Sequence, residues 1–407
     1  MNCRHCGAAL TRRFLDLGTA PPSNAYLDAA CLDRPEAWYP LRLLICEACW
    51  LAQTDDFAGR ETLFTEDYAY FSSFSTSWLD HARRYVGDMI ARFGLTARSC
   101  VAEVAANDGY LLQYVREAGI PAYGIEPTAS TAAAARARGI EIVQEFFGVA
   151  LAARLAGEGR GADLIAANNV LAHVPDINDF VGGFARLLKP DGVATFEFPH
   201  LVAMIRECQF DTAYHEHYSY LSLAAVERIF AANGLAAFDV ERLPTHGGSL
   251  RVFAQRTGGR RAATPALAAL RALEARAGVA ASEFYAGFQQ AAETVKDDLL
   301  RFLLEARRGG ARVAAYGAAA KGNTLLNFAG VRADLLPYVV DRNPAKAGRF
   351  MPGSRIPIVA EAVLREHCPD LILILPWNLK DEVMAQLAYA REWGARFVTA
   401  VPSLQIT

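Results

Sequence analysis

The chain repeats an alternation of short apolar segments and helical segments, and this alternation restricts its fold more than any other feature. In the first half, the predicted strands lie at 100–105, 122–125, 163–167 and 192–198, and the predicted helices at 78–93, 111–118 and 130–138. In the second half, predicted strands at 312–316, 338–340, 371–375 and 397–401 follow a helical stretch at 262–308. Strands that alternate with helices form parallel sheets whose faces the helices cover. The sequence therefore predicts an α/β protein with two Rossmann-like units.

The length of the chain leaves room for more than these two units. Its 407 residues exceed what one hydrophobic core usually serves. Residues 1 to about 70 show little periodicity and hold two cysteine pairs. We predict three domains: a zinc-binding domain at 1–72, a first α/β domain at 73–261 and a second α/β domain at 262–407.

The two cysteine pairs have the spacing of a structural metal site. Cys3 and Cys6 form one Cys-x-x-Cys pair, and Cys46 and Cys49 form the other. Each pair presents two thiolates from one tight turn, and two such turns complete a tetrahedral sulfur site for zinc. His5 is a further candidate ligand, although four thiolates already suffice. Because a fully thiolate-bound zinc leaves no position for water, we expect a structural role.

The composition excludes some classes of partner. The formal net charge of −3 gives no electrostatic reason to expect nucleic acid. No apolar run approaches the roughly 20 residues that cross a bilayer. The first residues lack the apolar core of a signal peptide. We expect a cytoplasmic protein with reduced thiols, bound neither to nucleic acid nor to a membrane. No sequence pattern determines its oligomeric state.

The first α/β unit carries a cofactor signature. Its first strand contains Glu103 and leads into a turn with Asn107 and Gly109, and the next strand ends at Glu126. A carboxylate at that position can accept both ribose hydroxyls of an adenosine ligand. The glycine fingerprint of dinucleotide sites is absent, which favours a nucleoside ligand without a diphosphate, such as S-adenosylmethionine. A later strand ends in Asn168 and Asn169, as in the fourth strand of a class I methyltransferase.

The second unit has features that suit a phosphate ligand. A strand leads into Gly317, and the following helix opens with Lys321. Backbone amides at a helix N-terminus, together with a lysine, suit a diphosphate. Asp341 follows the next strand, where it could meet a ribose or a base. No Walker pattern is present, so phosphoryl transfer is not expected.

Between the two units, residues 210–220 concentrate proton-handling side chains. This segment holds three tyrosines, two histidines and two carboxylates in eleven residues and has no helical apolar stripe. Histidine has the unperturbed pKa nearest neutrality, so His215 and His217 are candidates for proton abstraction. This composition therefore predicts an active-site loop.

These motifs together resemble a known family, the S-adenosylmethionine-dependent sugar C-methyltransferases. The resemblance runs through nearly the whole chain: both cysteine pairs and the segments 68–75, 103–110, 168–175, 196–200, 214–217, 246–251, 316–323, 341–348 and 376–378. It implies an N-terminal zinc domain, a central S-adenosylmethionine domain and a C-terminal domain that holds a nucleotide diphosphate. It also implies methylation at C3 of a 4-keto-6-deoxy sugar carried on dTDP.

C-methylation needs a base that removes an α-proton and donors that stabilise the resulting enolate. We expect His217 to be the base, Tyr214 and His173 to support the enolate oxygen, and Glu216 to orient an imidazole; His215 could exchange roles with His217. The predicted cofactor contacts are Tyr70, Ser73, Glu103, Asn107, Gly109, Glu126, Asn168 and Asn169. The predicted substrate contacts are Glu197, Tyr316, Gly317, Lys321, Asn323, Asp341, Trp377 and Asn378.

Two alternatives remain open at this point. An enzyme of the same fold could methylate oxygen or nitrogen on another small metabolite, and it would need no enolate-forming cluster. A zinc-ribbon protein that binds nucleic acid would instead show a basic face, whereas the basic residues here are dispersed. The sequence does not identify the sugar, its C3 substituent or the stereochemistry.

Overall fold

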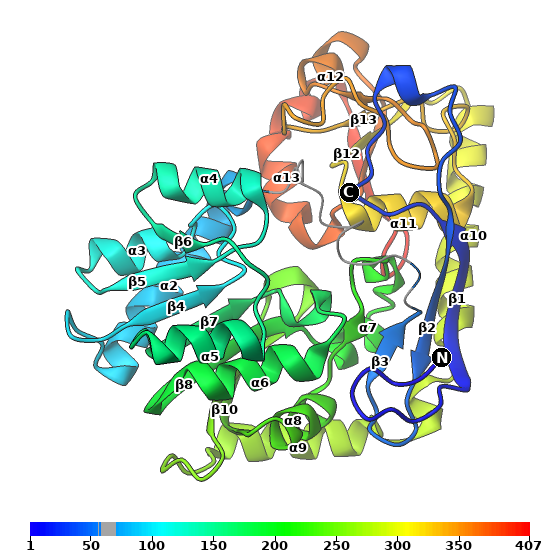
Figure 1. Ribbon diagram of the computed structural model, residues 1–407. Coiled ribbons are helices and arrows are strands. Elements are labelled where there is room, and N and C mark those ends of the chain that lie inside the picture. Colours follow the sequence, from blue (N-terminus) through cyan, green and yellow to red (C-terminus); the bar gives the residue numbers. More distant parts are fainter. Residues whose placement is uncertain (56, 58–70) are drawn as a thin grey trace.

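The computed structural model describes residues 1–55, 57 and 71–407 (Figure 1). It has three sheets, which confirms the predicted α/β class with a separate N-terminal module. The predicted strands and helices all occur, with ends displaced by a few residues. No helix in the described part of the chain is both long and apolar enough to span a bilayer.

The N-terminal module is an antiparallel sheet, which the sequence analysis missed. Its order is β1 (Arg12–Ala20), β2 (Tyr39–Ile45), β3 (Ala52–Thr54) and β9 (Ser219–Tyr220). The register of β1 against β2 shifts twice, between Arg13 and Leu15 and between Asp16 and Thr19. Such bulges interrupt the alternation of buried and exposed side chains. This interruption explains why the segment shows little periodicity in sequence.

The second sheet has seven strands in the order β10-β11-β8-β7-β4-β5-β6. Its strands are β4 (Val101–Val104), β5 (Ala122–Ile125), β6 (Glu141–Val143), β7 (Ala162–Asn168), β8 (Leu188–Pro199), β10 (Leu235–Leu243) and β11 (Ser249–Arg256). Strand β11 runs antiparallel to both of its neighbours, and the other pairs are parallel. The associated helices are α2 (Thr76–Phe93), α3 (Leu112–Glu117), α4 (Ala129–Ala137), α5 (Val149–Gly157), α6 (Ile177–Leu187), α7 (Leu201–Arg206) and α8 (Leu223–Ala232).

The third sheet has six strands in the order β14-β13-β12-β15-β16-β17. These are β12 (Val313–Tyr316), β13 (Val339–Val340), β14 (Ile358–Val359), β15 (Leu371–Ile374), β16 (Arg396–Thr399) and the antiparallel edge strand β17 (Gln405–Ile406). Its helices are α11 (Ala320–Ala329), α12 (Ala362–His367) and α13 (Lys380–Gln386). Two helices precede it, α9 (Pro265–Ala277) and α10 (Phe288–Arg308).

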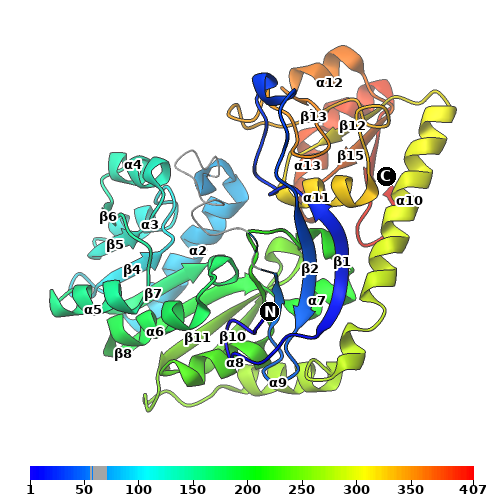
Figure 2. The same cartoon turned by 45° about the vertical axis from the view of Figure 1, so that its right-hand side comes forward.

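Several contacts join these parts across the predicted domain boundaries. Strand β9 lies within the predicted range 73–261 but pairs with β3 of the N-terminal module. Helix α9 follows position 261, yet its buried Leu267 and Leu270 belong to the core of the seven-stranded sheet. In Figures 1 and 2, β1 and β2 run beside α10. The boundaries at 72 and 261 therefore remain a prediction.

Residues 21–36 of the N-terminal module form a strap across the third sheet's domain. Leu27 forms a bridge with Phe350. Farther along the strap, the Glu36 carboxylate accepts a hydrogen bond from Arg355 Nε at 2.8 Å. Figure 2 shows this N-terminal segment rising from β1 and β2 toward α12 and β13. The strap thus links the cysteine-bearing module to the C-terminal domain.

Candidate active site and zinc centre

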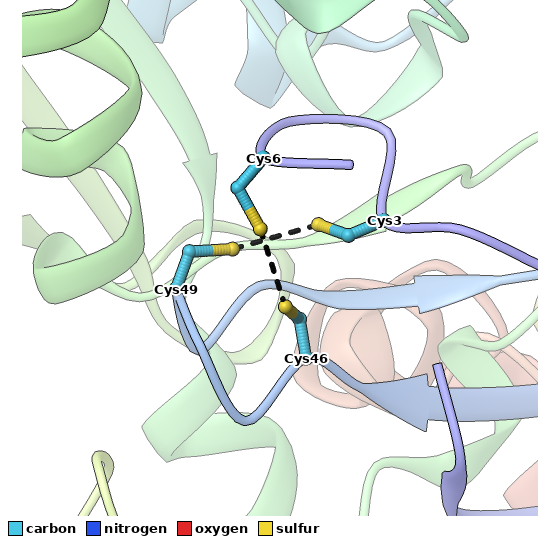
Figure 3. Close-up of side chains that lie close together, drawn as sticks. All are labelled: Cys3, Cys6, Cys46 and Cys49. Carbon is cyan, nitrogen blue, oxygen red and sulfur yellow. Dashed lines mark hydrogen bonds between the residues drawn. The ribbon is translucent and has the colours of Figure 1, made fainter. Parts of the chain in front are cut away.

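The four cysteines converge on one point (Figure 3). Their Sγ atoms all lie within 4.8 Å of one another, and the Cys3–Cys49 and Cys6–Cys46 pairs are 3.5 Å apart. In tetrahedral zinc, sulfur atoms at about 2.3 Å from the metal stand about 3.8 Å apart. The cluster therefore fits zinc with only slight expansion.

Two further observations support a structural zinc centre. Gln53 Nε2 donates a hydrogen bond to Cys3 Sγ at 3.3 Å, as a thiolate ligand requires. His5 lies outside the ligand set, because its Nδ1 is 2.8 Å from Asn178 Oδ1. Zinc bound here would hold two turns together and supply no open coordination position.

One cavity of about 940 Å³ is lined by all three parts of the chain. It lies between the seven-stranded sheet, the 210–217 segment and the N-terminus of α11. The predicted site residues that line it are Asn107, Glu126, Asn168, Asn169, His173, Tyr214, Glu216, His217, Lys321 and Asn378. Others are absent from its lining: Ser73, Glu103, Gly109, His215, Glu197, Tyr316, Gly317, Asn323, Asp341 and Trp377. Tyr70 lies outside the described residues.

The edge formed by β4 and β5 carries a buried carboxylate and a turn with left-handed backbone conformations. Glu126 is buried at the end of β5, and its two carboxylate oxygens accept the backbone N–H groups of Asn107 and Thr128, each at 2.9 Å. Asn107 has a φ of +49°, and its side-chain oxygen accepts the N–H of Ser72 at 2.9 Å. Burial raises the pKa of Glu126, whereas these backbone donors oppose that rise. The side chains of Thr128 and Thr131 also hydrogen-bond to this carboxylate and favour its charged form.

Three predicted cofactor contacts lie behind this edge. Glu103 is fully buried, and burial raises the pKa of its carboxyl well above the usual value. Gly109 has a φ of +79°, and a Cβ there would lie 2.2 Å from Ile140. Ser73 donates its backbone N–H to Asp108 at 3.4 Å and its hydroxyl accepts from Arg138 at 2.8 Å. These residues support the turn from behind and do not line the cavity, and their role as direct cofactor contacts stays a prediction.

His217 is a buried, neutral imidazole. Its Nδ1 lies 3.0 Å from the carbonyl oxygen of Thr212. Because a carbonyl only accepts, Nδ1 carries the proton and Nε2 keeps the basic lone pair. Burial and the neighbouring His173 hold the pKa of His217 well below its usual value. The ring centroid of His217 is 3.9 Å from that of Tyr214 and 4.6 Å from that of His173.

The two other members of the segment face the N-terminal module. His215 Nε2 donates to the carbonyl of Tyr39 at 3.3 Å, which separates it from His217. Glu216 accepts a hydrogen bond from Asn24 Nδ2 at 2.6 Å, and burial raises the pKa of its carboxyl to about 7. The hydrogen-bond partner of Glu216 is thus an amide from the strap rather than the predicted imidazole.

The cavity also has a group of aromatic and charged residues, on the side of the seven-stranded sheet, for which the sequence predicted no shared site. Trp78 stacks on His81 at 4.8 Å and lies 5.4 Å from His246, centroid to centroid. His246 has a left-handed φ of +54° and accepts a hydrogen bond from Asn169 Nδ2 at 3.1 Å. Strained histidines of this kind gather at functional sites.

Glu197 organises this group instead of lining the cavity. It is fully buried, and its carboxylate lies 2.9 Å from His81 Nε2 and accepts from Arg251 Nη2 at 2.8 Å. Burial alone would raise its pKa, but His81 and Arg251 outweigh burial and lower it. His81 and Arg251 line the cavity. Glu197 thus lies behind these two side chains, and its role as a substrate contact stays a prediction.

Several residues of the C-terminal domain that were predicted to contact the substrate form hydrogen bonds or packing contacts within the protein. Asp341 Oδ2 accepts the backbone N–H of Ala318 at 2.7 Å. Asn323 donates to the carbonyl of Ser23 at 2.9 Å, and the hydroxyl of Tyr316 is hydrogen-bonded to Gln386. Gly317 packs on Pro376, where a Cβ would lie 2.5 Å from the proline ring. These contacts shape the turn before α11.

Other residues at this end line the cavity and were not predicted. Lys346 lies over the ring of Tyr26 at 5.0 Å and donates to the carbonyl of Ala318 at 2.8 Å. Ala319 and Ala320 also line the cavity, as does Asn24 from the strap. No pattern in the strap sequence indicated that it reaches another domain, so only the fold could identify Asn24.

Comparisons with known proteins agree with this architecture. Three family models match: "Putative zinc binding domain" at residues 3–64, "Methyltransferase domain" at 78–240 and "C-methyltransferase C-terminal domain" at 244–402. The chain is 32% identical over 404 residues to C-methyltransferase NovU of Streptomyces niveus, covering 99% of this chain and 96% of that protein.

Solved structures resemble only a part of the chain. Magnesium protoporphyrin IX methyltransferase of Synechocystis, with bound SAM, is 17% identical with a TM-score of 0.34, and the match covers 44% of this chain and 79% of that one. A Burkholderia thailandensis 1,6-didemethyltoxoflavin-N1-methyltransferase is 19% identical with a TM-score of 0.38, covering 51% and 95%. The full-length match to NovU and the three family models show that the chain belongs to the S-adenosylmethionine-dependent C-methyltransferases with an N-terminal zinc module.

Proposed function

We propose that this C-methyltransferase adds a methyl group to C3 of a dTDP-linked 4-keto-6-deoxy sugar. One observation carries the proposal: a single cavity joins the adenosine-shaped edge at Glu126, the basic imidazole of His217 and the N-terminus of α11. A carbon nucleophile requires a base beside a ketone, whereas methylation of an oxygen or nitrogen does not. The family resemblance found in the sequence supports a sugar nucleotide as the ligand.

His217 is the proposed base. Its Nδ1–H is held by the Thr212 carbonyl, so Nε2 is directed to act as the proton acceptor. Tyr214 and His173 lie beside it, and we propose that Tyr214 donates a hydrogen bond to the enolate oxygen while His173 supports this side of the pocket. Burial lowers the pKa of His173 to about 4, and its hydrogen bond to the backbone of Glu216 opposes this shift, so the ring is neutral. S-adenosylmethionine, when bound, supplies an electrophilic methyl group.

The ligand-binding roles follow from the same cavity. We propose that Asn107, Glu126, Asn168 and Asn169 hold the cofactor, because they line the cavity at the carboxyl ends of the strands. The backbone amide of Ala320 at the N-terminus of α11 and the ammonium of Lys346 would hold the diphosphate. The domain limits at 72 and 261 and the cytoplasmic location remain predictions.

The first experiment asks whether two ligands bind. Calorimetric titration with S-adenosylhomocysteine and then with dTDP is expected to show two independent sites. Binding of the adenosyl ligand without dTDP would keep the methyltransferase and remove the nucleotide-sugar assignment.

The second experiment tests the base. His217→Ala is expected to abolish methylation, and also exchange of the C3 proton with D₂O, while the affinity for S-adenosylhomocysteine stays near normal. His215→Ala is the matched comparison, because His215 faces Tyr39 and is expected to retain exchange. An active His217→Ala enzyme would refute the assignment, and an oxygen- or nitrogen-methylated product without exchange would favour the alternative reaction.

A further inference from the structure

Lys321 is held at the junction of the C-terminal domain and the catalytic segment. It is the second residue of α11 and lines the cavity. Its Nζ donates to Asn378 Oδ1 at 2.9 Å and lies 4.4 Å from the ring centroid of Trp377. Among the described residues, no carboxylate lies within ion-pair distance of this ammonium. Burial lowers the pKa of the Lys321 ammonium to about 8, and the Asp211 carboxylate opposes this shift, so a cation held by an aromatic face and an amide lies at the cavity wall.

The residues around Trp377 fix where this ammonium lies. The Trp377 indole N–H donates to the buried carboxylate of Asp211 at 2.7 Å. On its other side, Trp377 packs so closely on Gly247 that a Cβ there would lie 2.5 Å from the ring. Trp377 is therefore fixed between the segment that carries His217 and the loop that carries His246, and Lys321 lies over it.

Helix α11 is also bound directly to the catalytic segment. Thr324 Oγ1 donates to the carbonyl of Ala213 at 2.8 Å, and the next residue is Tyr214. Residues three apart lie on the same face of a helix, so Lys321 shares this face with Thr324. The charge of Lys321 acts on both neighbouring imidazoles, because it contributes to the lowered pKa of His217 and of His246.

The second lysine of the cavity is arranged differently. Lys346 Nζ donates to the carbonyl of Ala318 and lies 3.9 Å from the Asp341 carboxylate. These contacts place it over the turn before α11, on the side of the C-terminal domain. The two cations therefore have different hydrogen-bond partners around the cavity.

We propose that Lys321 is a catalytic residue whose ammonium stabilises the enolate oxygen, rather than a ligand of the diphosphate. This inference rests on the proposed C3-methylation. The C3–H bond breaks and its proton passes to His217 Nε2. The bonding pair moves into a C3–C4 double bond, and the C4 oxygen gains the negative charge that Lys321 faces. The enolate carbon then bonds to the methyl carbon of the cofactor, the sulfur keeps the electron pair of the broken S–C bond, and the C4 carbonyl reforms.

Exchange of the C3 proton with D₂O in the presence of S-adenosylhomocysteine isolates enolate formation from methyl transfer. In this assay, Lys321→Met is expected to slow exchange at least 100-fold and to change dTDP affinity less than threefold. Lys321→Arg is expected to restore part of the exchange, because it restores the charge. Lys346→Met is expected to show the reverse pattern, with weaker dTDP binding and a much smaller loss of exchange at saturating substrate.

Lys380→Met is the matched control, since Lys380 is exposed at the start of α13 and does not line the cavity. This variant should leave the rate of C3 proton exchange and the affinity for dTDP unchanged. A different result would show that Lys321 is a diphosphate ligand and that the inference is wrong. In that case the Lys321→Met variant would bind dTDP at least tenfold more weakly but would exchange the C3 proton at the normal rate at saturating substrate. Absence of exchange in the wild-type protein with bound keto sugar would overturn the proposed function itself, which distinguishes the two failures.

Discussion

The two parallel sheets share one architecture but use their ligand-binding edges differently. In the seven-stranded sheet, the turn after β4 and the carboxylate ending β5 both line the cavity. In the six-stranded sheet, the equivalent carboxylate, Asp341, accepts the same kinds of backbone N–H group as Glu126, one from the turn after β12 and one from its own turn, but it does not line the cavity. Tyr26 from the strap donates to the carbonyl of Ala318 at 2.6 Å. A strand-turn-helix pattern therefore predicts where an edge lies, but packing decides whether a ligand or the protein itself occupies it.

Removal of zinc should produce the largest contrast between the two edges. The strap that closes the second edge begins in the cysteine module, and Thr54 of this module donates to the carbonyl of His217 at 3.1 Å. Because structural zinc contributes folding free energy directly, stripping the metal should abolish methylation and dTDP binding. Affinity for S-adenosylhomocysteine, measured by calorimetry, should change less than threefold; an equal loss of both would show that the module supports both edges.

Glu126→Gln should weaken cofactor binding strongly. The substitution removes the charge of a buried acceptor, and a hydrogen bond to a charged group contributes about 1.5–3 kcal/mol, or roughly 10- to 100-fold in affinity. Calorimetry with S-adenosylhomocysteine measures the effect, and dTDP affinity serves as the internal control. Unchanged cofactor affinity would remove Glu126 from the ribose site.

Asp341→Asn is the corresponding change in the second sheet, and it should act on stability instead. The side chain accepts the N–H groups of Ala318 and Asn343, so its loss should cost about 1–3 kcal/mol of unfolding free energy, seen by denaturant titration. The affinity for dTDP should change less than threefold. A loss of dTDP affinity matching the effect of Glu126→Gln on the cofactor would show that the two edges are used alike.

Asn24→Ala should have the smallest effect, a shift in pH dependence. The Asn24 amide donates to Glu216 and thereby favours its carboxylate form. Without this donor the Glu216 pKa rises from about 7, so the corresponding inflection in kcat/KM should move upward by about one pH unit. Asn24→Asp would add a negative charge and move it further in the same direction. An unmoved inflection would mean that Glu216 does not govern the profile.

The sequence predicted the features that depend on neighbours in the chain. The Cys-x-x-Cys pairs, the strand ends at Glu126 and Asn168 and the histidine segment are local patterns, and the structure brings them to the expected places. Orientation could not be predicted in the same way. His215 and His217 are two residues apart, yet one faces Tyr39 and the other faces the cavity, because each is held by a carbonyl from a different turn.

Contacts between distant segments account for the remaining errors. Trp78 and His81 carry no local signature, and His246 belongs to a segment of the family resemblance for which no role was predicted. The packing of α2 against the loop after β10 brings the three together. From the sequence, Glu103 and Glu197 were predicted to contact a ligand, but the sheet buries both side chains. Whether a polar strand residue reaches the cavity depends on which face of the sheet it occupies and on what packs there.

The strap at residues 21–36 has a consequence for engineering the enzyme. It crosses from the cysteine module onto the far domain, where Leu27 pairs with Phe350 and Asn24 reaches the cavity. A graft that exchanged only the C-terminal portion between two relatives would leave the host strap against a foreign surface. A chimera intended to accept a new sugar should therefore transplant two pieces that are far apart in the gene, the strap together with the domain beneath it.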